Sequence, residues 1–487
     1  MKTTLTTLTL ALAALTALPI HALEERRSTA ADQTGLAVTI YNGNLALVKD
    51  ARKVKLGGGE NRLAWREVSA RMQPETALLH TLDGSALTLL EQNFDFDLLT
   101  PQSLLEKSVG SSVKVIRNLP VTGTEFVENA TILAANNGVV LQFIDRVETG
   151  IPGRMAFPSV PPDLRDRPTL AMLLKTDGPA NPMLTSERQL ELTYLTGGLT
   201  WKADYVAELS DKEDRMDLSG WVTLTNTSGT SYPNARLQLV AGQVNRAQPE
   251  PIAKQMMARA MAMAEAAPAM QEEGLFEYHL YTLPRNTTLG DNQTKQVALL
   301  SAQDVAITKE YRLDGANWYY TGQHGDLGQK LKPGVFVEFG NQDKESGGKL
   351  GVPLPKGVVR VYKKDSAGRA QFVGEDRIDH TAKGEVVRLK LGEAFDITAD
   401  KKQTDYQKLA AAYNSRTGVI ETAYQLEIRN AKSEAVTVKV VEPMPGEWQM
   451  VQESQPHVKD AAHTATWVVP VPADGKAVLS WRVRIRY

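Results

Sequence analysis

The chain has 487 residues, of which 42% are hydrophobic and none is cysteine, and its formal net charge is −2. This length predicts roughly three to four folding units, since most domains hold about 100–150 residues. The nearly balanced charge excludes a strongly basic surface for nucleic acid or anionic lipid, and the lack of cysteine excludes a disulfide framework. We therefore expect a fold that is held together by packing and strand pairing alone.

The first 22 residues are typical of a secretory signal peptide. Lys2 supplies a positive start, residues 5–18 form an apolar run, and residues 20–22 resemble a small-residue cleavage site. The run is too short to cross a membrane, and no later segment reaches about 18 apolar residues. We expect cleavage after Ala22, no membrane-spanning segment in the mature chain, and an exported protein of the periplasm or the cell surface.

Residues 35–100 predict an N-terminal β domain, because short β-rich runs alternate with Asn and Gly clusters. Its first two strands are expected at residues 36–42 and 44–48. After a brief helix or connector at residues 103–109, three short strands follow in quick succession. Residues 101–165 are therefore expected to form a small barrel that resembles an SH3 or Sm-like fold.

Residues 166–247 predict strands of a central β-sandwich, and the clearest strands lie at residues 193–242. We interpret Trp201 and Trp221, which lie in these strands, as core anchors. Residues 248–275 are rich in Met and Ala and predict a linker or a helix. Residues 276–400 continue the central β domain, and residues 401–487 form a C-terminal β-sandwich that includes a short helix at residues 405–413.

One pattern recurs along the chain: two apolar residues at alternate positions are followed, after one more residue, by Asn. It ends at Asn42, Asn226, Asn341 and Asn430. This pattern is typical of a half-buried strand that is ended by a side chain bonded to its own turn. The fold class is therefore expected to be all-β, with several immunoglobulin-like β-sandwich modules, the small barrel and the short helical Met/Ala-rich insertion.

Several runs resemble a bacterial family catalogued as domain of unknown function 4139. They are residues 192–205, the turn Asn226-Thr-Ser-Gly229, residues 237–242 and residues 350–357. Residues 38–48 are also similar to the way such proteins begin, so that the resemblance covers most of the mature chain. It implies an exported or envelope-associated β-rich protein with no established catalytic activity and no agreed functional residues.

Some members of that family are named mucoidy inhibitor A. The resemblance to this type is incomplete, because such members commonly carry a long coiled coil where this chain has the short strands of residues 101–165. The role in exopolysaccharide control that the name suggests is therefore not carried over to this chain.

Two short motifs match known sites only in part. The run from Ser111 to Lys114 has the Ser-x-x-Lys spacing of penicillin-binding enzymes, but it lies on an expected strand and the partner motifs are missing. The acidic run from Asp211 to Asp214 lacks the glycine and the final glutamate of an EF-hand calcium loop. We interpret the first as a strand and the second as the cap of a hairpin.

Three carboxylates lie close together in the sequence. Asp95 and Asp97 would share one face of a strand, with Glu91 nearby, and such a pair has the composition of a glycosidase site. An ordinary acidic sheet edge has the same pattern. This alternative makes the protein a hydrolase or a glycan-active enzyme whose site is built from distant loops.

Histidine and methionine are the remaining candidate ligands. No His-Glu-x-x-His motif exists, and we interpret the six histidines that follow the signal peptide as loop residues. Five of the 13 methionines lie in the Met/Ala-rich segment: Met256, Met257, Met261, Met263 and Met270. Thioethers select Cu(I), which makes copper handling a second alternative, although the same spacing suits an apolar helix stripe.

The last strand alternates apolar residues with Arg482, Arg484 and Arg486, which predicts a closing sandwich strand with a basic outer face. No residue is assigned as catalytic, cofactor-binding or metal-binding, and no cofactor is expected. The main hypothesis is a non-enzymatic scaffold or binding protein of the cell envelope. Its expected partner is an envelope protein or a glycan, and no nucleic acid.

Overall fold

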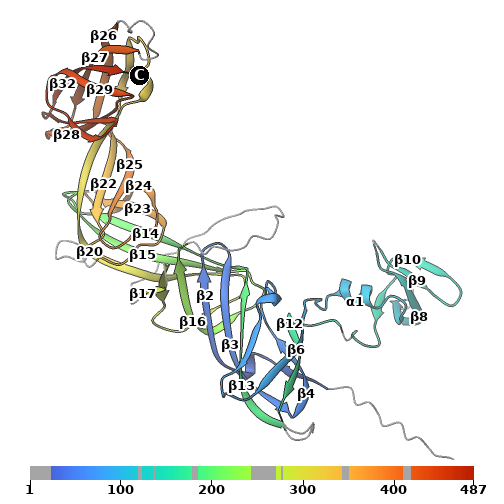
Figure 1. The fold of residues 1–487 in the computed structure, drawn as a ribbon. Coiled ribbons are helices and arrows are strands. Elements are labelled where there is room, and N and C mark those ends of the chain that lie inside the picture. Colours follow the sequence, from blue (N-terminus) through green and yellow to red (C-terminus); the bar gives the residue numbers. More distant parts are fainter. Residues whose placement is uncertain are drawn as a thin grey trace, which may run out of the picture.

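The computed structural model describes residues 24–118, 123–136, 138–161, 163–177, 185–242, 270–275, 278–342, 350–409 and 418–486. In these ranges the chain is mostly β-strand, with one α-helix, α1 (Pro101–Lys107), and three 3-10 turns. The strands form five sheets (Figure 1). The mostly-β class is therefore confirmed, whereas the expected signal peptide lies outside the described residues.

Two sheets combine N-terminal strands with strands from the middle of the chain. The four-stranded sheet has the order β1 (Glu25–Ser28), β4 (Gly59–Arg66), β12 (Thr169–Thr176), β6 (Leu87–Asp95). The eight-stranded sheet has the order β17 (Gln271–Leu275), β18 (Tyr278–Thr282), β16 (Tyr232–Ala241), β2 (Gln33–Tyr41), β3 (Leu45–Gly57), β13 (Thr185–Thr196), β5 (Leu78–Thr81), and β19 (Thr287–Leu289) pairs with β16. The N-terminal strands β2 and β3 thus lie between β16 and β13 and complete their sheet.

The other two large sheets contain the second half of the chain. The ten-stranded sheet has the order β24 (Ala370–Ile378), β23 (Gly357–Lys364), β14 (Leu199–Leu209), β15 (Arg215–Asn226), β20 (Gln293–Asp314), β28 (Val436–Pro443), β31 (Thr464–Val471), β30 (Val458–Ala461), with β22 (Gly334–Gly340) between β20 and β25 (Val386–Glu393). The five-stranded sheet has the order β21 (Asp326–Leu331), β26 (Ile397–Leu409), β27 (Val419–Asn430), β32 (Gly475–Arg486), β29 (Glu447–Glu453).

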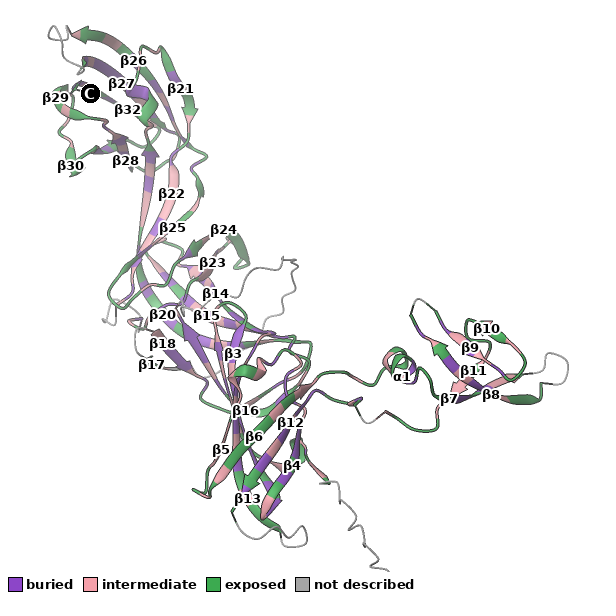
Figure 2. Cartoon of the chain, turned by 45° about the vertical axis from the view of Figure 1, so that its right-hand side comes forward, coloured by how far each residue is buried: buried purple, intermediate pink, exposed green. Residues whose placement is uncertain are grey.

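Buried and exposed residues alternate along many of these strands, and Figure 2 colours each residue by its burial. In β14, Trp201, Ala203 and Tyr205 face inward, because successive side chains of a strand point to opposite faces. Trp201 belongs to a core that extends from Val38 to Leu389, which we call the central core. Trp201 is thus the expected core anchor, whereas Trp221 is only half-buried.

A second core, which we call the C-terminal core, contains residues between Tyr311 and Ile485. Strand β20 contributes to both cores. Val305 and Ile307 are buried in the central core, whereas Leu313 is buried in the C-terminal core. Because one hydrogen-bonded strand runs through both cores, no loop separates them along this path.

Residues 101–165 differ from the expected barrel. Their strands form a sheet, which we call the small sheet, in the order β10 (Val147–Thr149), β9 (Val140–Gln142), β8 (Glu125–Ala134), β7 (Ser112–Asn118), β11 (Arg154–Ala156). No closed barrel is detected in the described residues, because the edge strands β10 and β11 are not paired with each other. The small sheet has its own core, which includes Val115 and Ile132, and stands to one side of the other sheets (Figure 1).

Two local expectations also need correction. Residues 405–409 belong to strand β26 and pair with β27, so the helix expected at residues 405–413 is wrong there. Residues 271–275 form strand β17, which pairs with β18, although a linker or helix was expected over residues 248–275. In both places a partner strand overrides the local propensity. Residues 248–269, with four of the five methionines of the Met/Ala-rich segment, lie outside the described residues. The division of the chain into domains stays a prediction.

The recurring asparagines explain how several strands end. Asn226 is fully buried at the end of β15, where its side-chain oxygen accepts the Ser228 N–H at 3.0 Å. Its amide donates to the Thr230 carbonyl at 2.8 Å and to the Gly290 carbonyl at 2.9 Å. At the end of β27, the side-chain oxygen of Asn430 accepts the Lys432 N–H at 3.0 Å, and its amide donates to the Glu434 carbonyl at 2.8 Å. As at Asn226, these partners lie two and four positions later in the chain. The two strand ends are therefore built in the same way.

A buried ion pair lies inside the C-terminal core. The Lys401 Nζ is 2.5 Å from Glu442 Oε1, and the Tyr320 hydroxyl donates to Glu442 Oε2 at 2.8 Å. Both charged side chains are 2% exposed. Burial lowers the pKa of Lys401, which Glu442 partly opposes. Aromatic rings surround the ammonium group, and the nearest, that of Tyr319, is 4.1 Å away.

The asparagine bonds make a testable prediction. Asn226→Ala should lower the free energy of unfolding by about 3 kcal/mol, because it leaves a backbone N–H and three carbonyls without this partner. Urea unfolding followed by tryptophan fluorescence measures the change. The exposed Asn93 serves as control, and Asn93→Ala should change the stability by less than about 0.5 kcal/mol. Equal losses in the two variants would contradict a special role for Asn226.

Candidate functional site

A cleft of about 260 Å³ opens where the N-terminal strands meet β13 and β16. We call it the Asp50 cleft. Polar side chains from several strands and loops line it, among them Gln33, Asp50, Arg52, Glu67, Tyr194 and Tyr232. This cleft joins residues far apart in the sequence to a buried polar network, and it is therefore the candidate site.

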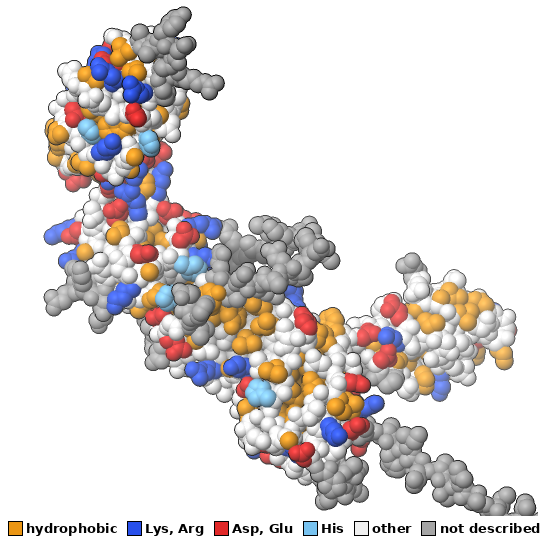
Figure 3. Space-filling model, in the orientation of Figure 1, with side chains coloured by type: hydrophobic (Ala, Val, Ile, Leu, Met, Phe, Trp, Pro, Cys, Tyr) orange, Lys and Arg blue, Asp and Glu red, His pale blue; other side chains and the backbone are white. Residues whose placement is uncertain are grey.

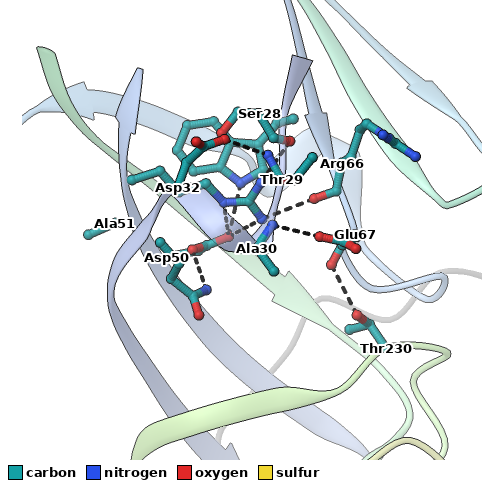
Figure 4. A network of polar contacts seen from close by, with 12 residues as sticks. Ser28, Thr29, Ala30, Asp32, Asp50, Ala51, Arg66, Glu67 and Thr230 are labelled. Atoms are coloured by element: carbon teal, nitrogen blue, oxygen red, sulfur yellow. Dashed lines mark hydrogen bonds and ion pairs between the residues drawn. The ribbon is translucent and has the colours of Figure 1, made fainter. Parts of the chain in front are cut away.

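Asp50 lies at the centre of this network (Figure 4). Its Oδ2 accepts hydrogen bonds from Arg52 Nη2 at 2.7 Å, from Arg52 Nε at 3.0 Å and from Trp65 Nε1 at 2.9 Å. Its Oδ1 accepts a bond from Gln33 Nε2 at 2.7 Å. The carboxylate thus has four donors, which offset the cost of its burial.

Arg52 is equally well bound. It is only 2% exposed, and its guanidinium lies 4.7 Å from the centre of the Trp65 ring. Beyond Asp50, it donates to the carbonyl of Ser28 at 3.0 Å and to the carbonyl of Arg66 at 2.9 Å. The guanidinium therefore ties the ends of β1 and β4 to β3. The guanidinium N–H groups thus donate to the carboxylate and backbone carbonyls of the protein itself.

Glu67 has a strained backbone at the wall of the cleft. Its φ of 66° lies in the left-handed region, which is costly for a residue other than Gly, Asn or Asp. Its carboxylate accepts the Ala30 N–H at 2.6 Å, and its carbonyl accepts the Thr230 hydroxyl at 3.0 Å. The contacts of Glu67 therefore join the N-terminal segment to the turn that follows Asn226.

Two buried tyrosines complete the cleft. Burial raises the pKa of Tyr232 to about 12 and holds the pKa of Tyr194 well above its usual value. The Tyr232 hydroxyl donates to Ser228 Oγ at 3.0 Å, and the Tyr194 hydroxyl accepts the Ser69 N–H at 3.2 Å. Both hydroxyls are neutral at physiological pH and can act as hydrogen-bonding groups, but not as bases.

The histidines are dispersed over the structure. Three lie beside glutamates: His80 with Glu191, His279 with Glu272, His457 with Glu453. Others contact backbone groups: His324, His380, His463. Within the described ranges no histidine is hydrogen-bonded to a serine, so these contacts assemble no Ser-His pair.

The acidic candidates are bound to different cations. Asp95 accepts a bond from Arg165 Nε at 2.9 Å, whereas Asp97 lies 2.8 Å from Lys107 Nζ. In the part of the chain that the structure describes, no group of three or more His, Asp or Glu side chains could hold a metal ion. The four methionines of residues 256–263 lie outside that part, and Met270 packs partly buried against the central core.

The remaining motifs have structural roles. Lys114 lies on strand β7 and is exposed, as expected for a strand and unlike a helical Ser-x-x-Lys site. The expected basic face of the last strand is largely neutralised, because Arg482 and Arg484 both contact Glu421. Within the described residues, no helix has the length and apolar character needed to cross a membrane.

Sequence reasoning missed the Asp50 network. The signal was present in β3, where Val48, Asp50 and Arg52 share one face of the strand. Two charged residues at successive inward positions indicate a buried ion pair. The partners Trp65 and Gln33 carry no such signal, because only the pairing of the strands brings them to Asp50.

Fold and site together define a β-rich protein with several cores and a polar cleft whose charged groups are largely bound internally. Residues 190–487 match the family described as Domain of unknown function (DUF4139), and the chain belongs to this family. The resemblance seen in the sequence is therefore confirmed. No curated protein matches the chain. The matched region begins within β13, so the Asp50 cleft combines family residues with N-terminal residues that precede the match.

The buried ion pair makes the second prediction. Asp50→Leu should lower the free energy of unfolding by about 3–5 kcal/mol, because it leaves the Arg52 guanidinium buried without its counter-ion. The double variant Asp50→Leu/Arg52→Met removes both charges and should regain at least half of that loss. Urea unfolding of both variants measures the difference. A double variant as unstable as the single one would show that the charge pairing is not the cause.

The pKa of Tyr232 makes the third prediction. Its folded value of about 12 lies above the usual value of about 10. The stability that this difference contributes is complete below about pH 10 and is lost as the pH rises towards 12. Tyr232→Phe should therefore reduce the fall in the free energy of unfolding by about 1.4 kcal/mol per pH unit in that window. Urea titrations at pH 9 to 12 measure it, and an unchanged slope would contradict the assignment.

Proposed function

We propose that the protein is an exported, non-enzymatic scaffold or binding protein of the cell envelope, built from immunoglobulin-like β-sandwich modules. Export is supported by the positive start, the apolar run and the cleavage-site pattern of residues 1–22. The modular character is supported by the separate cores and by the matching strand ends at Asn226 and Asn430.

The observation that carries the binding role is the outer face of the small sheet. Val115 and Ile132 point into its core, so the opposite face carries Ile116 and Val127, which are paired across β7 and β8. Val127 is 51% exposed, and Val147 on β10 is 54% exposed. Figure 3 shows hydrophobic side chains gathered on this unit. Exposed apolar groups of this kind mark interaction sites, and they favour an envelope protein over a glycan as partner.

The way in which the small sheet is attached supports the same role. It follows β6 and precedes β12, and a single bridge between Leu98 and Arg165 links its two connecting segments. Lys107 joins these segments further by ion pairs with Asp97 and Asp163 at 2.8 and 2.7 Å. The sheet is therefore presented away from the central core, where a partner has access to it.

The absence of catalysis is inferred from how the charged groups are used. Asp50 and Arg52 satisfy each other, and Asp95 is paired with Arg165. A catalytic site needs a titratable group that is positioned for a substrate. The bonding partners of these groups are instead side chains and backbone groups of the protein, which supports a structural role for the Asp50 cleft.

Photo-crosslinking in intact bacterial cells tests the proposal and makes the fourth prediction. With p-benzoylphenylalanine in place of Val127, ultraviolet light should give a discrete adduct with one envelope protein. The control places the same group at Lys202, whose side chain is 66% exposed on β14 and which should give no such adduct. No adduct from Val127, or equal adducts from both positions, would contradict the proposed surface.

Fractionation of the same cells tests export separately. The protein should appear in the periplasmic or envelope fraction without residues 1–22, as mass spectrometry of its N-terminus would show. A full-length protein in the cytoplasmic fraction would contradict export without deciding whether the small sheet binds a partner.

A further inference from the structure

A second pocket, of about 190 Å³, opens at one end of the central core. Its lining residues belong to strands β20, β22 and β25, to strands β14, β23 and β24, and to the turn that contains Glu213. Close to it, β24 approaches β25 without pairing with it in the ladder. At Gly374 a Cβ atom would lie 2.3 Å from the Leu391 carbonyl oxygen, so only glycine allows this approach. Val373 on β24 and Leu391 on β25 both line the pocket beside this close approach.

The inside of the pocket is apolar. Leu209, Ile307 and Val337 are less than a tenth exposed, and Leu391 and Val373 complete the wall nearer to solvent. An engineered apolar cavity of about 150 Å³ takes up benzene, so this volume is sufficient for a short aliphatic chain. Burial of such a chain is favourable by about 0.8 kcal/mol for each methylene group.

The more exposed part of the pocket is charged. Lys363 Nζ lies 2.6 Å from Glu213 Oε1, and Lys309 Nζ is bonded to Glu213 Oε2. The three side chains are 26–30% exposed, so they lie between the apolar wall and solvent. Two ammonium groups thus share one carboxylate in direct contact, and Glu393 also lines the pocket.

Glu213 is held in an unusual way. Its φ of 56° lies in the left-handed region, and it belongs to the turn between β14 and β15. Burial opposes its ionisation, but Lys309 and Lys363 lower its pKa overall. A strained glutamate whose carboxylate lies between two lysines occupies the place where the head group of an anionic ligand would lie.

We propose that this pocket binds a single-chain amphiphile with a carboxylate head group. The aliphatic chain packs against Leu209, Ile307 and Val337, and the carboxylate meets Lys309 and Lys363 in exchange for Glu213. The site lies within the central core and does not depend on the small sheet or on its proposed partner.

Isothermal titration of the mature protein with sodium octanoate tests this and makes the fifth prediction. Octanoate should bind with a stoichiometry of one, and Lys309→Gln/Lys363→Gln should weaken it at least tenfold. Glu213→Gln should tighten it several-fold, because the competing carboxylate is removed. The matched control Lys364→Gln, on the neighbouring residue that pairs with Glu208, should leave the affinity unchanged.

Two further arms separate the chain from the head group. Val373→Trp should abolish binding, because the indole fills the pocket from its exposed side. Val373 is 40% exposed, so the substitution leaves the core below it intact. Octanol and octyltrimethylammonium test whether the carboxylate is needed, and both should bind at least tenfold more weakly than octanoate. No binding of octanoate, equal binding of the three amphiphiles, unchanged binding in Val373→Trp or the lysine variant, or weaker binding in Glu213→Gln would overturn the proposal.

Discussion

Strand β20 belongs to both the central core and the C-terminal core, and it determines how these two cores are joined. Its first part pairs with β15, and its last residues pair in parallel with β28. Strand β22 behaves similarly, since Val337 lies in the central core and Val335 packs against the C-terminal core. A bend between the cores would break ladder bonds of two strands, whereas the small sheet is attached through connecting segments.

Buried polar groups mark the places where segments far apart in the sequence meet. The Asp50–Arg52 pair joins β3 to the ends of β1 and β4, and the Lys401–Glu442 pair joins β26 to β28. A charge inside a core is tolerated only with its partner in place, so these pairs penalise alternative strand registers. Asn226 and Asn430 do the same for loops, because their amides bond backbone groups that no strand ladder reaches.

The two pockets differ in how their charges are used. In the Asp50 cleft the carboxylate and the guanidinium bind each other and the backbone, which suits a structural junction between the N-terminal strands and the family domain. In the second pocket Glu213 is shared by Lys309 and Lys363 beside an apolar wall, and Glu393 also lines the pocket. The second arrangement offers a ligand more binding free energy, because burial of its apolar chain is favourable, whereas the polar groups of the Asp50 cleft are already hydrogen-bonded to each other.

Much of the local structure was predictable from the sequence. Alternation of apolar residues identified the strands, and the apolar-x-apolar-x-Asn pattern located strand ends such as Asn226 and Asn430. The family was also recognisable, because its turns and strand runs are continuous in the chain. The helix expected at residues 405–413 was wrong at residues 405–409, because these residues pair with β27. The small barrel expected at residues 101–165 is an open sheet, because its edge strands β10 and β11 do not pair.

The sequence by itself therefore determined the β class, strand ends such as those at Asn226 and Asn430, and the family, because these depend on residues that are neighbours in the chain. Only the tertiary structure decided that Val38 pairs with Leu237, that Trp65 and Gln33 reach Asp50, and that β20 serves two cores. The physical reason is that these contacts depend on strand pairings between distant segments. Local propensity and periodicity carry no information about which distant strand supplies the partner.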